Sequence, residues 1–543
     1  MKSFRVALSA LWGLVLSLNS CPFAAKSALT GNSRRRYRVV LCLALTTIPA
    51  ALAAADCSKL AEFRMPGAEL EITSTENVAA AAPNTVHAPG APGAVGVALP
   101  AYCRVEGVID KRVGVAGKQY GIRFALAMPE QWSGRFLFQG GGGLNGTVGM
   151  PLGAGVAGDL PALARGFAVV STDSGHQGAV FDGSFFQDQQ ATLDFHYVAN
   201  GRVTIVAKEL IATYYGRKPE RSYFVGCSTG GREAMIMAQR YPNYFDGLVA
   251  GAPAMRTGHS NLALAYIASI FAQVSPEASQ MLSDSDRKLV VDSLLATCDA
   301  RDGLQDGMIF DTRGCDFDPA VLTCKGAKAE GCLSAEQVAA LKKAFAGPRD
   351  PCGNQVYPGF AYDPGIGNRA GLPGLLYGPR IPVRQENTGK PFEVGEAAAR
   401  VQADASARLG DATWTNLSSF SGHGGKLLFY HGMADPWFSA LDTVGYYEKV
   451  VRENGGRNAV ESWCRIFLVP GMGHCGGGLA TLDRFDLLGV ITDWVEKGAA
   501  PETVIATGKA FPGRSRPLCA YPKFAHYTGQ GDANDAKNFV CKE

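Results

Sequence analysis

The stretch YFVGCSTGGREA, residues 223–234, directs the interpretation of the whole chain. It contains the pattern Gly-x-Ser-x-Gly between Gly226 and Gly230, after a strand-like run and before a helix-like run that continues to Tyr241. A serine on a sharp turn from strand to helix projects its hydroxyl outward, and the glycines allow close approach of the backbone. The start of the helix also directs N–H groups towards a developing oxyanion. The pattern therefore predicts Ser228 as a nucleophile.

Strand-like and helix-like runs alternate on both sides of this motif, and a region of different character separates them. Such alternation predicts a mostly parallel sheet covered by helices, an α/β fold. The strand-like runs are YGIRFALAM, GRFLFQ, FAVVST, SYFVG, DGLVAG, KLLFYHG and CRIFLVPG, and helices are expected near residues 203–215, 441–453 and 485–497.

The middle region, residues 256–425, is rich in glycine and proline, has locally spaced cysteines and shows few strand-like runs. We expect a loop-rich insertion with its own disulfides, packed as a lid over the carboxyl edge of the sheet. The alternative is an independent domain beside the core. The predicted organisation is a targeting segment (1–55), the first part of the core (56–255), the lid domain (256–425) and the second part of the core (426–543).

Residues 1–55 are typical of a targeting segment, with an arginine-rich start, a short apolar stretch and small residues at 51–55. We expect cleavage near Ala55 and no membrane association afterwards; the alternative is an N-terminal membrane anchor. The segment holds seven Lys and Arg and no acid, so 45 basic residues (52 − 7) and 49 acidic residues remain. That balance of −4 gives no electrostatic reason to expect nucleic acid as a partner.

Cysteine usage also indicates export. Of 14 cysteines, Cys21 and Cys42 lie in the leader, which leaves 12 (14 − 2). No Cys-x-x-Cys zinc pattern is present, so disulfides are expected, and with them a periplasmic or extracellular location. The pairs expected from their positions are Cys57 with Cys103, Cys298 with Cys315, Cys324 with Cys332, and Cys519 with Cys541.

A nucleophilic serine needs a base and an orienting carboxylate, which follow later strands of such a sheet in the order Ser, Asp, His. Asp435 follows KLLFYHG, and His474 follows CRIFLVPG. His431 lies at the end of a strand and is interpreted as a buried structural residue, while His176 precedes the serine. The sequence therefore predicts Ser228, Asp435 and His474 as a triad; the alternative is three unrelated turn residues.

Backbone amides for an oxyanion are expected at two places. The glycine run FQGGGGLNG follows the strand GRFLFQ, where the first oxyanion loop of such folds lies, and the second donor is the residue after the nucleophile. We expect the N–H groups of Gly143 and Thr229 in this role. No Gly-Lys-Ser/Thr follows the glycines, which argues against phosphate binding.

The serine and the histidine each have a cysteine neighbour, Cys227 and Cys475. A bond between them would tie the turn of the nucleophile to the loop of the base. Closing a loop of 248 residues (475 − 227) is nominally worth ~5 kcal/mol of chain entropy.

The motifs GCSTGG, HGMADPWFS and PGMGHCGGG together resemble the tannase and feruloyl esterase family, whose signature is Cys-Ser, then Asp, then His-Cys. The resemblance covers nearly the whole mature chain. It implies an α/β-hydrolase core with an inserted disulfide-rich lid domain, and hydrolysis of esters of aromatic acids. By position it implies a nucleophile, base and orienter at Ser228, His474 and Asp435, oxyanion donors at Gly143 and Thr229, and a bridge from Cys227 to Cys475. Cys352 and Cys464 have no evident counterpart in the family, so they bond to each other or stay free.

A loop of the insertion, CDARDGLQDGMIFDTRGC, repeats carboxylates between Cys298 and Cys315. Hard oxygen ligands so spaced suit calcium, although the spacing is not that of an EF-hand; the alternative is a capped turn rich in aspartate. The family resemblance implies a structural Ca²⁺ here, held by Asp299, Asp302 and Asp306 and by the carbonyls of Leu304 and Met308.

Aromatic residues directly after Asp435 bear on the substrate. The rings of Trp437 and Phe438 are expected to wall the cleft and to suit a flat acyl group, and the resemblance also places an aromatic residue at Phe438. The family includes tannases, feruloyl and chlorogenate esterases, and terephthalate monoester hydrolases. The lid segment 351–413 is short beside the last group, whose carboxylate-binding arginine has no alignable counterpart.

We therefore expect a secreted serine esterase acting on small esters of phenolic acids such as feruloyl, galloyl or chlorogenate-type esters. Its first alternatives are a hydrolase of terephthalate-type esters, and an extracellular polyester depolymerase or peptidase with the same triad. A non-catalytic binding protein on a hydrolase fold is an alternative of another class, but its usual sign, a broken triad, is not seen. The sequence gives no oligomeric state.

Overall fold

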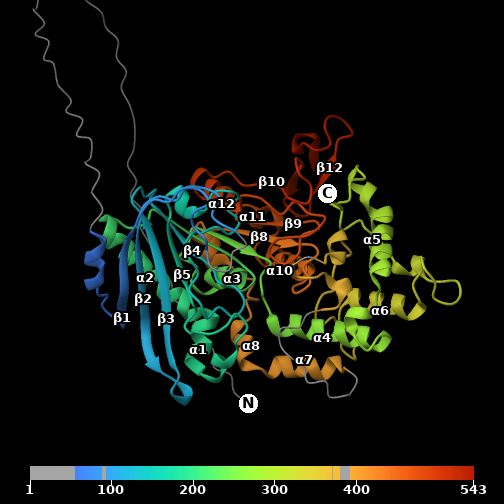
Figure 1. Cartoon of the computed structure of the whole chain (residues 1–543), viewed down its shortest axis with the longest axis horizontal. Helices are drawn as coiled ribbons and strands as arrows, with labels where there is room; N and C mark the ends of the chain where they lie inside the picture. The colour runs from blue at the N-terminus through green and yellow to red at the C-terminus, as the bar shows by residue number, and fades with distance from the viewer. Residues whose placement is uncertain (1–55, 89–92, 370, 380–391) are drawn as a thin grey trace, which may run out of the picture. The chain divides into compact units, whose positions relative to one another are not determined.

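The computed structural model describes residues 56–88, 93–369, 371–379 and 392–543, and Figure 1 shows their arrangement. The predicted leader and its cleavage site near Ala55 lie outside the described residues. Within the described ranges, no helix combines the length and apolar character needed to cross a membrane.

A nine-stranded mixed sheet forms the centre of the fold. The strands from β5 and β4 to β9 are parallel, and β1, β2, β3 and β5 pair antiparallel. In order across the sheet they are β1 (Leu70–Val78), β2 (Tyr102–Val113), β3 (Gln119–Pro129), β5 (Ala168–Thr172), β4 (Arg135–Gln139), β6 (Arg221–Cys227), β7 (Gly247–Gly251), β8 (Lys426–Gly432) and β9 (Cys464–Val469). The predicted α/β class is confirmed, and the sequence missed the antiparallel edge. This edge is antiparallel because the link from β2 to β3 is short, and a short link can join only antiparallel neighbours.

Helices cover both faces of this sheet. In β6, Phe224 packs in the cluster that includes residues of α2, α3 and α10, whereas Tyr223 and Val225 pack in the cluster that includes α12. Alternate side chains of a strand point to opposite faces, so a buried parallel strand needs apolar residues throughout. The helices of the core are α1 (Gln189–Leu193), α2 (Ala199–Tyr215), α3 (Thr229–Arg240), α10 (Ala440–Glu453), α11 (Arg457–Glu461) and α12 (Leu487–Lys497).

In its described part, the insertion between β7 and β8 contains six α-helices among its loops, and the expectation from composition missed these helices. Its helices are α4 (Thr257–Val274), α5 (Asp284–Cys298), α6 (Ala335–Ala346), α7 (Val394–Ala403), α8 (Ala405–Gly410) and α9 (Ser418–Gly422). Capping boxes at Ser283 and Ser334 start α5 and α6. The prediction from the sequence gave more weight to the glycine and proline content of the insertion than to these local capping signals. Residues of α4, α5 and α6 form a hydrophobic cluster of their own.

Five disulfides join the described cysteines, and all five predicted pairs are confirmed. They are Cys57–Cys103, Cys227–Cys475, Cys298–Cys315, Cys324–Cys332 and Cys519–Cys541. Cys352 is exposed and Cys464 is buried, and neither forms a disulfide. The two cysteines therefore stay free and are not bonded to each other.

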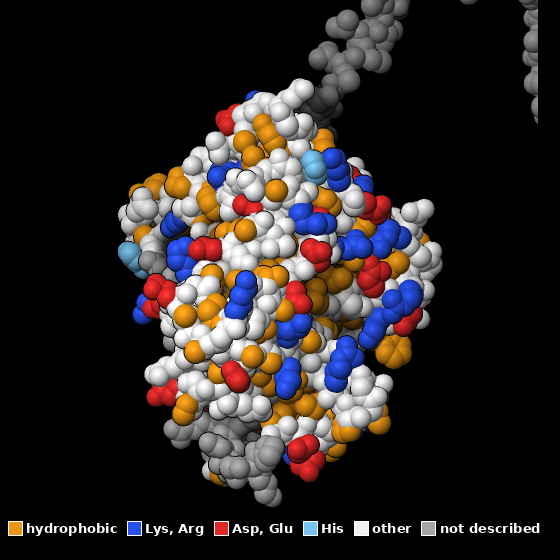
Figure 2. Space-filling view, turned by 90° about the vertical axis from the view of Figure 1, so that its right-hand side faces the viewer, with side chains coloured by type: hydrophobic (Ala, Val, Ile, Leu, Met, Phe, Trp, Pro, Cys, Tyr) orange, Lys and Arg blue, Asp and Glu red, His pale blue; other side chains and the backbone are white. Residues whose placement is uncertain are grey.

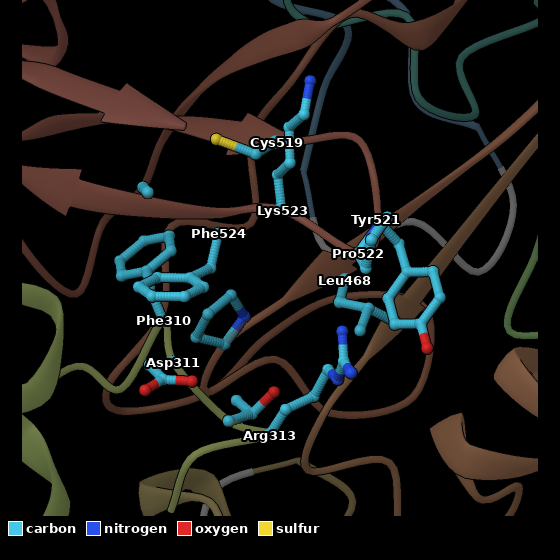
Figure 3. Close-up of a pocket in the computed structure, with 12 residues that line it drawn as sticks. Phe310, Asp311, Arg313, Leu468, Cys519, Tyr521, Pro522, Lys523 and Phe524 are labelled. Atoms are coloured by element: carbon cyan, nitrogen blue, oxygen red, sulfur yellow. The ribbon is translucent and has the colours of Figure 1, made fainter. Parts of the chain in front are cut away.

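The last part of the chain forms two small antiparallel pairs, β10 (Thr503–Thr507) with β11 (Ser515–Cys519) and β12 (Phe524–Tyr527) with β13 (Phe539–Lys542). Figure 3 shows Phe310 and Arg313 of the insertion beside Phe524 and Tyr521 of this part, around a cavity of about 30 Å³. That volume holds roughly one or two waters, so this junction cannot take an aromatic ester. Acidic and basic side chains are interspersed over the face shown in Figure 2.

Candidate active site

Ser228 lies on the turn between β6 and α3, with φ 63° and ψ −122°. This left-handed conformation is costly for a residue with a side chain, and it persists only where the surroundings hold it. Here the Ser228 N–H donates to the carbonyl of Gly251 at 3.0 Å, and the Ser228 carbonyl accepts from the N–H of Ala254 at 3.0 Å. The turn is therefore fixed to the end of β7.

The two glycines of the motif are required by close backbone contacts. A Cβ on Gly226 would lie 2.4 Å from the carbonyl oxygen of Gly230, and a Cβ on Gly230 would lie 2.7 Å from the carbonyl oxygen of Gly141. Any side chain at either position would push the strand, the helix and the glycine-rich loop apart. The pattern Gly-x-Ser-x-Gly thus allows three segments to meet at the serine.

Asp435 and His474 lie in the loops that follow β8 and β9, and they form a hydrogen bond of 2.7 Å between Nδ1 of the imidazole and Oδ2 of the carboxylate. Asp435 is 1% exposed, and its Oδ1 accepts the N–H groups of Trp437 and Phe438 at 2.8 and 3.1 Å. Burial alone would raise the pKa of Asp435, but the His474 and His431 rings outweigh it and hold that pKa well below its ordinary value. The carboxylate is therefore ionised and its orientation is fixed.

His431 contacts the same carboxylate, a role that the sequence analysis missed. Its Nε2 lies 3.2 Å from Oδ2 of Asp435 and 3.0 Å from the carbonyl oxygen of Phe438, both of which are acceptors. Nε2 must therefore carry the hydrogen, and Nδ1 is then free to accept from the Thr443 hydroxyl at 2.9 Å. The signal available in the sequence was the spacing of four residues between His431 and Asp435 across the end of a strand.

The structure joins the loops of Ser228 and His474 covalently but does not place their side chains in a hydrogen bond. The Cα atoms of Cys227 and Cys475 are 5.9 Å apart in the disulfide. Nε2 of His474 is buried and, among the described residues, has no hydrogen-bond partner. Such a contact is often long without substrate and forms only in the complex. The nitrogen that a base would use is thus unoccupied by other groups.

The glycine-rich loop lies against the start of α3. The loop carries Gly143 and the helix begins at Thr229, so the two expected oxyanion donors lie on facing segments. The Thr229 hydroxyl donates to the Gly143 carbonyl. The Thr229 N–H is in the first turn of α3, where N–H groups lack a partner within the helix. Glu233, fully buried one turn further on, accepts the Gly141 N–H at 2.9 Å and the Asn145 side chain at 3.1 Å. The sequence analysis missed this anchor.

A pocket of about 540 Å³ opens over Ser228. Its volume is within the range of about 300–1,000 Å³ that small-ligand sites occupy. Thr229 and Gly143 line it, as do the expected aromatic residues Trp437 and Phe438, whose rings lie 5.0 and 5.3 Å from that of His474. Lining residues that the sequence did not indicate include Phe181, Phe186, Phe195, His196 and Arg232.

The predicted calcium loop is closed by the Cys298–Cys315 disulfide. Its three carboxylates accept nearby backbone N–H groups, and Asp306 also pairs with Arg516. Burial, with the charges of Asp306 and Asp299, raises the pKa of Asp302 to about 7. Clustered carboxylates with carbonyls at Leu304 and Met308 are the donor types that Ca²⁺ prefers. In the described ranges, however, no three acidic, histidine or cysteine side chains are arranged around one metal position.

Comparison with known proteins agrees with this fold. A family model described as tannase and feruloyl esterase matches residues 103–374 and 388–542. The mono(2-hydroxyethyl) terephthalate hydrolase of Piscinibacter sakaiensis is 38% identical over 82% of this chain and 85% of its own, and a probable feruloyl esterase of Arthroderma benhamiae is 30% identical over 90% and 93%. The crystal structure of feruloyl esterase B from Aspergillus oryzae has a TM-score of 0.72 and 27% identity, and the match covers 90% of this chain and 99% of that one.

These findings define a carboxylic ester hydrolase with an α/β-hydrolase fold. More narrowly, the chain belongs to the tannase and feruloyl esterase family. A tannin acyl hydrolase from Aspergillus niger, at 23% identity and a TM-score of 0.68, shares the fold.

Proposed function

We propose that this chain hydrolyses esters of aromatic acids, with Ser228 as nucleophile, His474 as base and Asp435 as its orienting partner. The observation that carries the proposal is the 2.7 Å hydrogen bond between Asp435 and Nδ1 of His474, which leaves Nε2 without a partner in a loop bonded to the Ser228 turn. A base so oriented, in a loop bonded to the strained turn of the serine, supports acyl transfer.

In the first half of the reaction, Nε2 of His474 takes the proton of Ser228 as Oγ attacks the ester carbonyl. The negative charge that develops on the carbonyl oxygen is held by the N–H groups of Gly143 and Thr229. The imidazolium is stabilised by Asp435 and then gives its proton to the leaving alcohol. An acyl-enzyme and a free alcohol result.

In the second half, His474 takes a proton from water, and the hydroxide oxygen attacks the acyl carbon. Collapse of the second tetrahedral intermediate breaks the bond to Oγ of Ser228, which recovers its proton from His474. The products are the aromatic acid and free enzyme. No other group needs to change its protonation.

Feruloyl-, galloyl- or chlorogenate-type esters are the substrates that the proposal names first, because two of the similar proteins are feruloyl esterases by name. A terephthalate-type monoester is the second candidate. It is favoured by the 38% identity to a mono(2-hydroxyethyl) terephthalate hydrolase, despite the short lid segment. Polyester depolymerisation is a third candidate.

The test is a substrate panel with the purified full chain, comparing methyl ferulate, methyl gallate, a chlorogenate and mono(2-hydroxyethyl) terephthalate. We expect turnover of at least one phenolic ester, a loss of at least about 10³-fold in kcat for Ser228→Ala, and labelling of the wild type by a fluorophosphonate. Polymer cleavage without turnover of any phenolic ester would contradict the substrate class. A wild type that is inactive and unlabelled would contradict the catalytic role of Ser228.

We also propose a structural Ca²⁺ in the loop between Cys298 and Cys315, with Asp299, Asp302 and Asp306 and the Leu304 and Met308 carbonyls as ligands. Bound calcium would supply positive charge that offsets the crowded carboxylates, and it would take no part in the ester chemistry. We further propose export to an oxidising compartment, periplasmic or extracellular. The support for export is the five disulfides of the described chain.

A further inference from the structure

Phe181 is a large apolar side chain that is exposed to solvent at the rim of the pocket. It is 49% exposed, and it lines the pocket over Ser228. Its neighbour Val180 is 54% exposed, and Phe186, also at the pocket, is 40% exposed. Exposed apolar side chains that line a pocket mark a surface that a ligand covers. These three residues belong to a core loop between β5 and α1, not to the insertion.

The backbone of this loop is fixed to the glycine-rich loop that carries Gly143. The Leu144 N–H donates to the Val180 carbonyl at 2.9 Å, and the Gly178 N–H donates to the Gly146 carbonyl at 3.1 Å. Gly143 has φ 58°, and a Cβ on it would lie 2.7 Å from Val180. Phe181 is therefore held at a fixed position relative to the expected oxyanion donors.

On the other side of the pocket, Phe181 meets the loop after β8. Its ring centroid lies 6.1 Å from that of Trp437, with an angle of 87° between the planes. Trp437 in turn lies 5.0 Å from the His474 ring and packs against the hydrophobic cluster of the insertion. One aromatic wall thus runs from the oxyanion loop to the histidine, built by the core loop and the loop of Asp435.

We propose that Phe181 and Trp437 bind the aromatic ring of the ester's acid part and set the selectivity of this chain for aromatic over aliphatic acids. The inference rests on the proposed function. Two perpendicular rings form a corner in which a third flat ring meets the face of one and the edge of the other, both favourable arrangements. The acid part is the occupant because it is the aromatic part of the esters proposed as substrates.

The test compares three small esters with the full chain: methyl benzoate (aromatic acid), methyl butyrate (aliphatic acid) and phenyl acetate (aromatic alcohol). Phe181→Ala is expected to lower the ratio of kcat/KM for methyl benzoate to that for methyl butyrate by about tenfold, chiefly through KM. Phe181→Leu keeps apolar volume without a ring and should lie between. Trp437→Leu should lower the same ratio as an independent variant.

Trp414→Ala is the matched control, because Trp414 is an exposed aromatic residue that does not line the pocket. It should leave the ratio unchanged. Phe181 is half-exposed, so its variants should fold, which near-ultraviolet circular dichroism checks. An unchanged ratio in both Phe181→Ala and Trp437→Leu, or a loss confined to phenyl acetate, would overturn the inference while leaving the esterase function intact. A wild type that hydrolyses none of the three esters, nor any of the phenolic panel, would overturn both.

Discussion

At the scale of single residues, His431 shows how a side chain classed as structural can act on a reaction. It is fully buried at the end of β8, as its sequence position indicated. Its Nε2 faces both the Asp435 carboxylate and the Phe438 carbonyl, so one N–H helps to fix the orienting acid and the loop that carries a pocket wall. The pair of Asp435 and His474 is thus supported by a second imidazole.

Replacing this side chain tests its role. His431→Ala should lower kcat by about 100-fold, because a small displacement of the acid misorients His474. His431→Gln offers an N–H in a similar place and should recover part of the loss. Stopped-flow or steady-state kinetics on folded protein measure the effect, with circular dichroism as the control. Equal kcat in wild type and His431→Ala would show that Asp435 is held without it.

At the scale of elements, the site is an assembly of loop ends from β4, β6, β8 and β9. The glycines at 226 and 230 let α3 approach β6 and the glycine-rich loop. Glu233 of α3 then binds that loop through the Gly141 N–H and Asn145. The Cys227–Cys475 disulfide adds a covalent link between the β6 turn and the loop after β9. Each link fixes the distance between two catalytic candidates that lie far apart in sequence.

Removing the disulfide should therefore affect activity more than its stability cost explains. The double variant Cys227→Ala with Cys475→Ala leaves no unpaired thiol at the site and should lower kcat by at least about tenfold, together with a lower Tm from the loss of the cross-link. The matched control is Cys519→Ala with Cys541→Ala, which removes a disulfide away from the pocket. It should lower Tm without lowering kcat at 25 °C. Full activity in the first double variant would contradict the tether.

At the scale of the whole described chain, the insertion combines its own hydrophobic cluster with contacts to the first part of the core, through Gln239 and Arg240 of α3, and to the second part. Trp437 packs on that cluster from the loop of Asp435. The loop between Cys298 and Cys315 reaches the C-terminal strands, where Asp306 pairs with Arg516. The stability of this loop therefore bears on how the insertion is held against the core.

Calcium removal tests the proposed ion at this scale. If Ca²⁺ binds the folded chain, EDTA should lower Tm, since an ion at 100 times its Kd stabilises by about 2.7 kcal/mol. Asp302→Asn should abolish the response. Asp311→Asn, in the same disulfide loop but outside the proposed ligand set, should retain it. Differential scanning calorimetry measures the shift, and elemental analysis measures bound metal. An unchanged melt with no calcium detected would remove the site.

Local patterns predicted the parts of this fold that depend on neighbouring residues. The parallel strands, the turn at Ser228 and the helices α2, α10 and α12 follow from apolar periodicity and from glycine at close contacts. The sequence also contains signals for the antiparallel edge and for the helices of the insertion, namely the short link from β2 to β3 and the capping boxes at Ser283 and Ser334. Both were missed because the overall composition was given more weight. The pairing of Cys227 with Cys475, which are distant in sequence, follows from their positions next to Ser228 and His474, and the family resemblance implies the same bridge.

The sequence by itself determined the α/β class, the order Ser, Asp, His and the residues of the disulfide beside the site. These three features depend only on which residues are present and on their order along the chain, and the sequence gives both directly. Only the tertiary structure decided that His431 shares the carboxylate of Asp435 and that Glu233 holds the glycine-rich loop. It also decided that Phe181 faces Trp437 across the pocket. The contacts of Glu233 and Phe181 join residues 92 and 256 positions apart (233 − 141 and 437 − 181), and no local pattern encodes such distances.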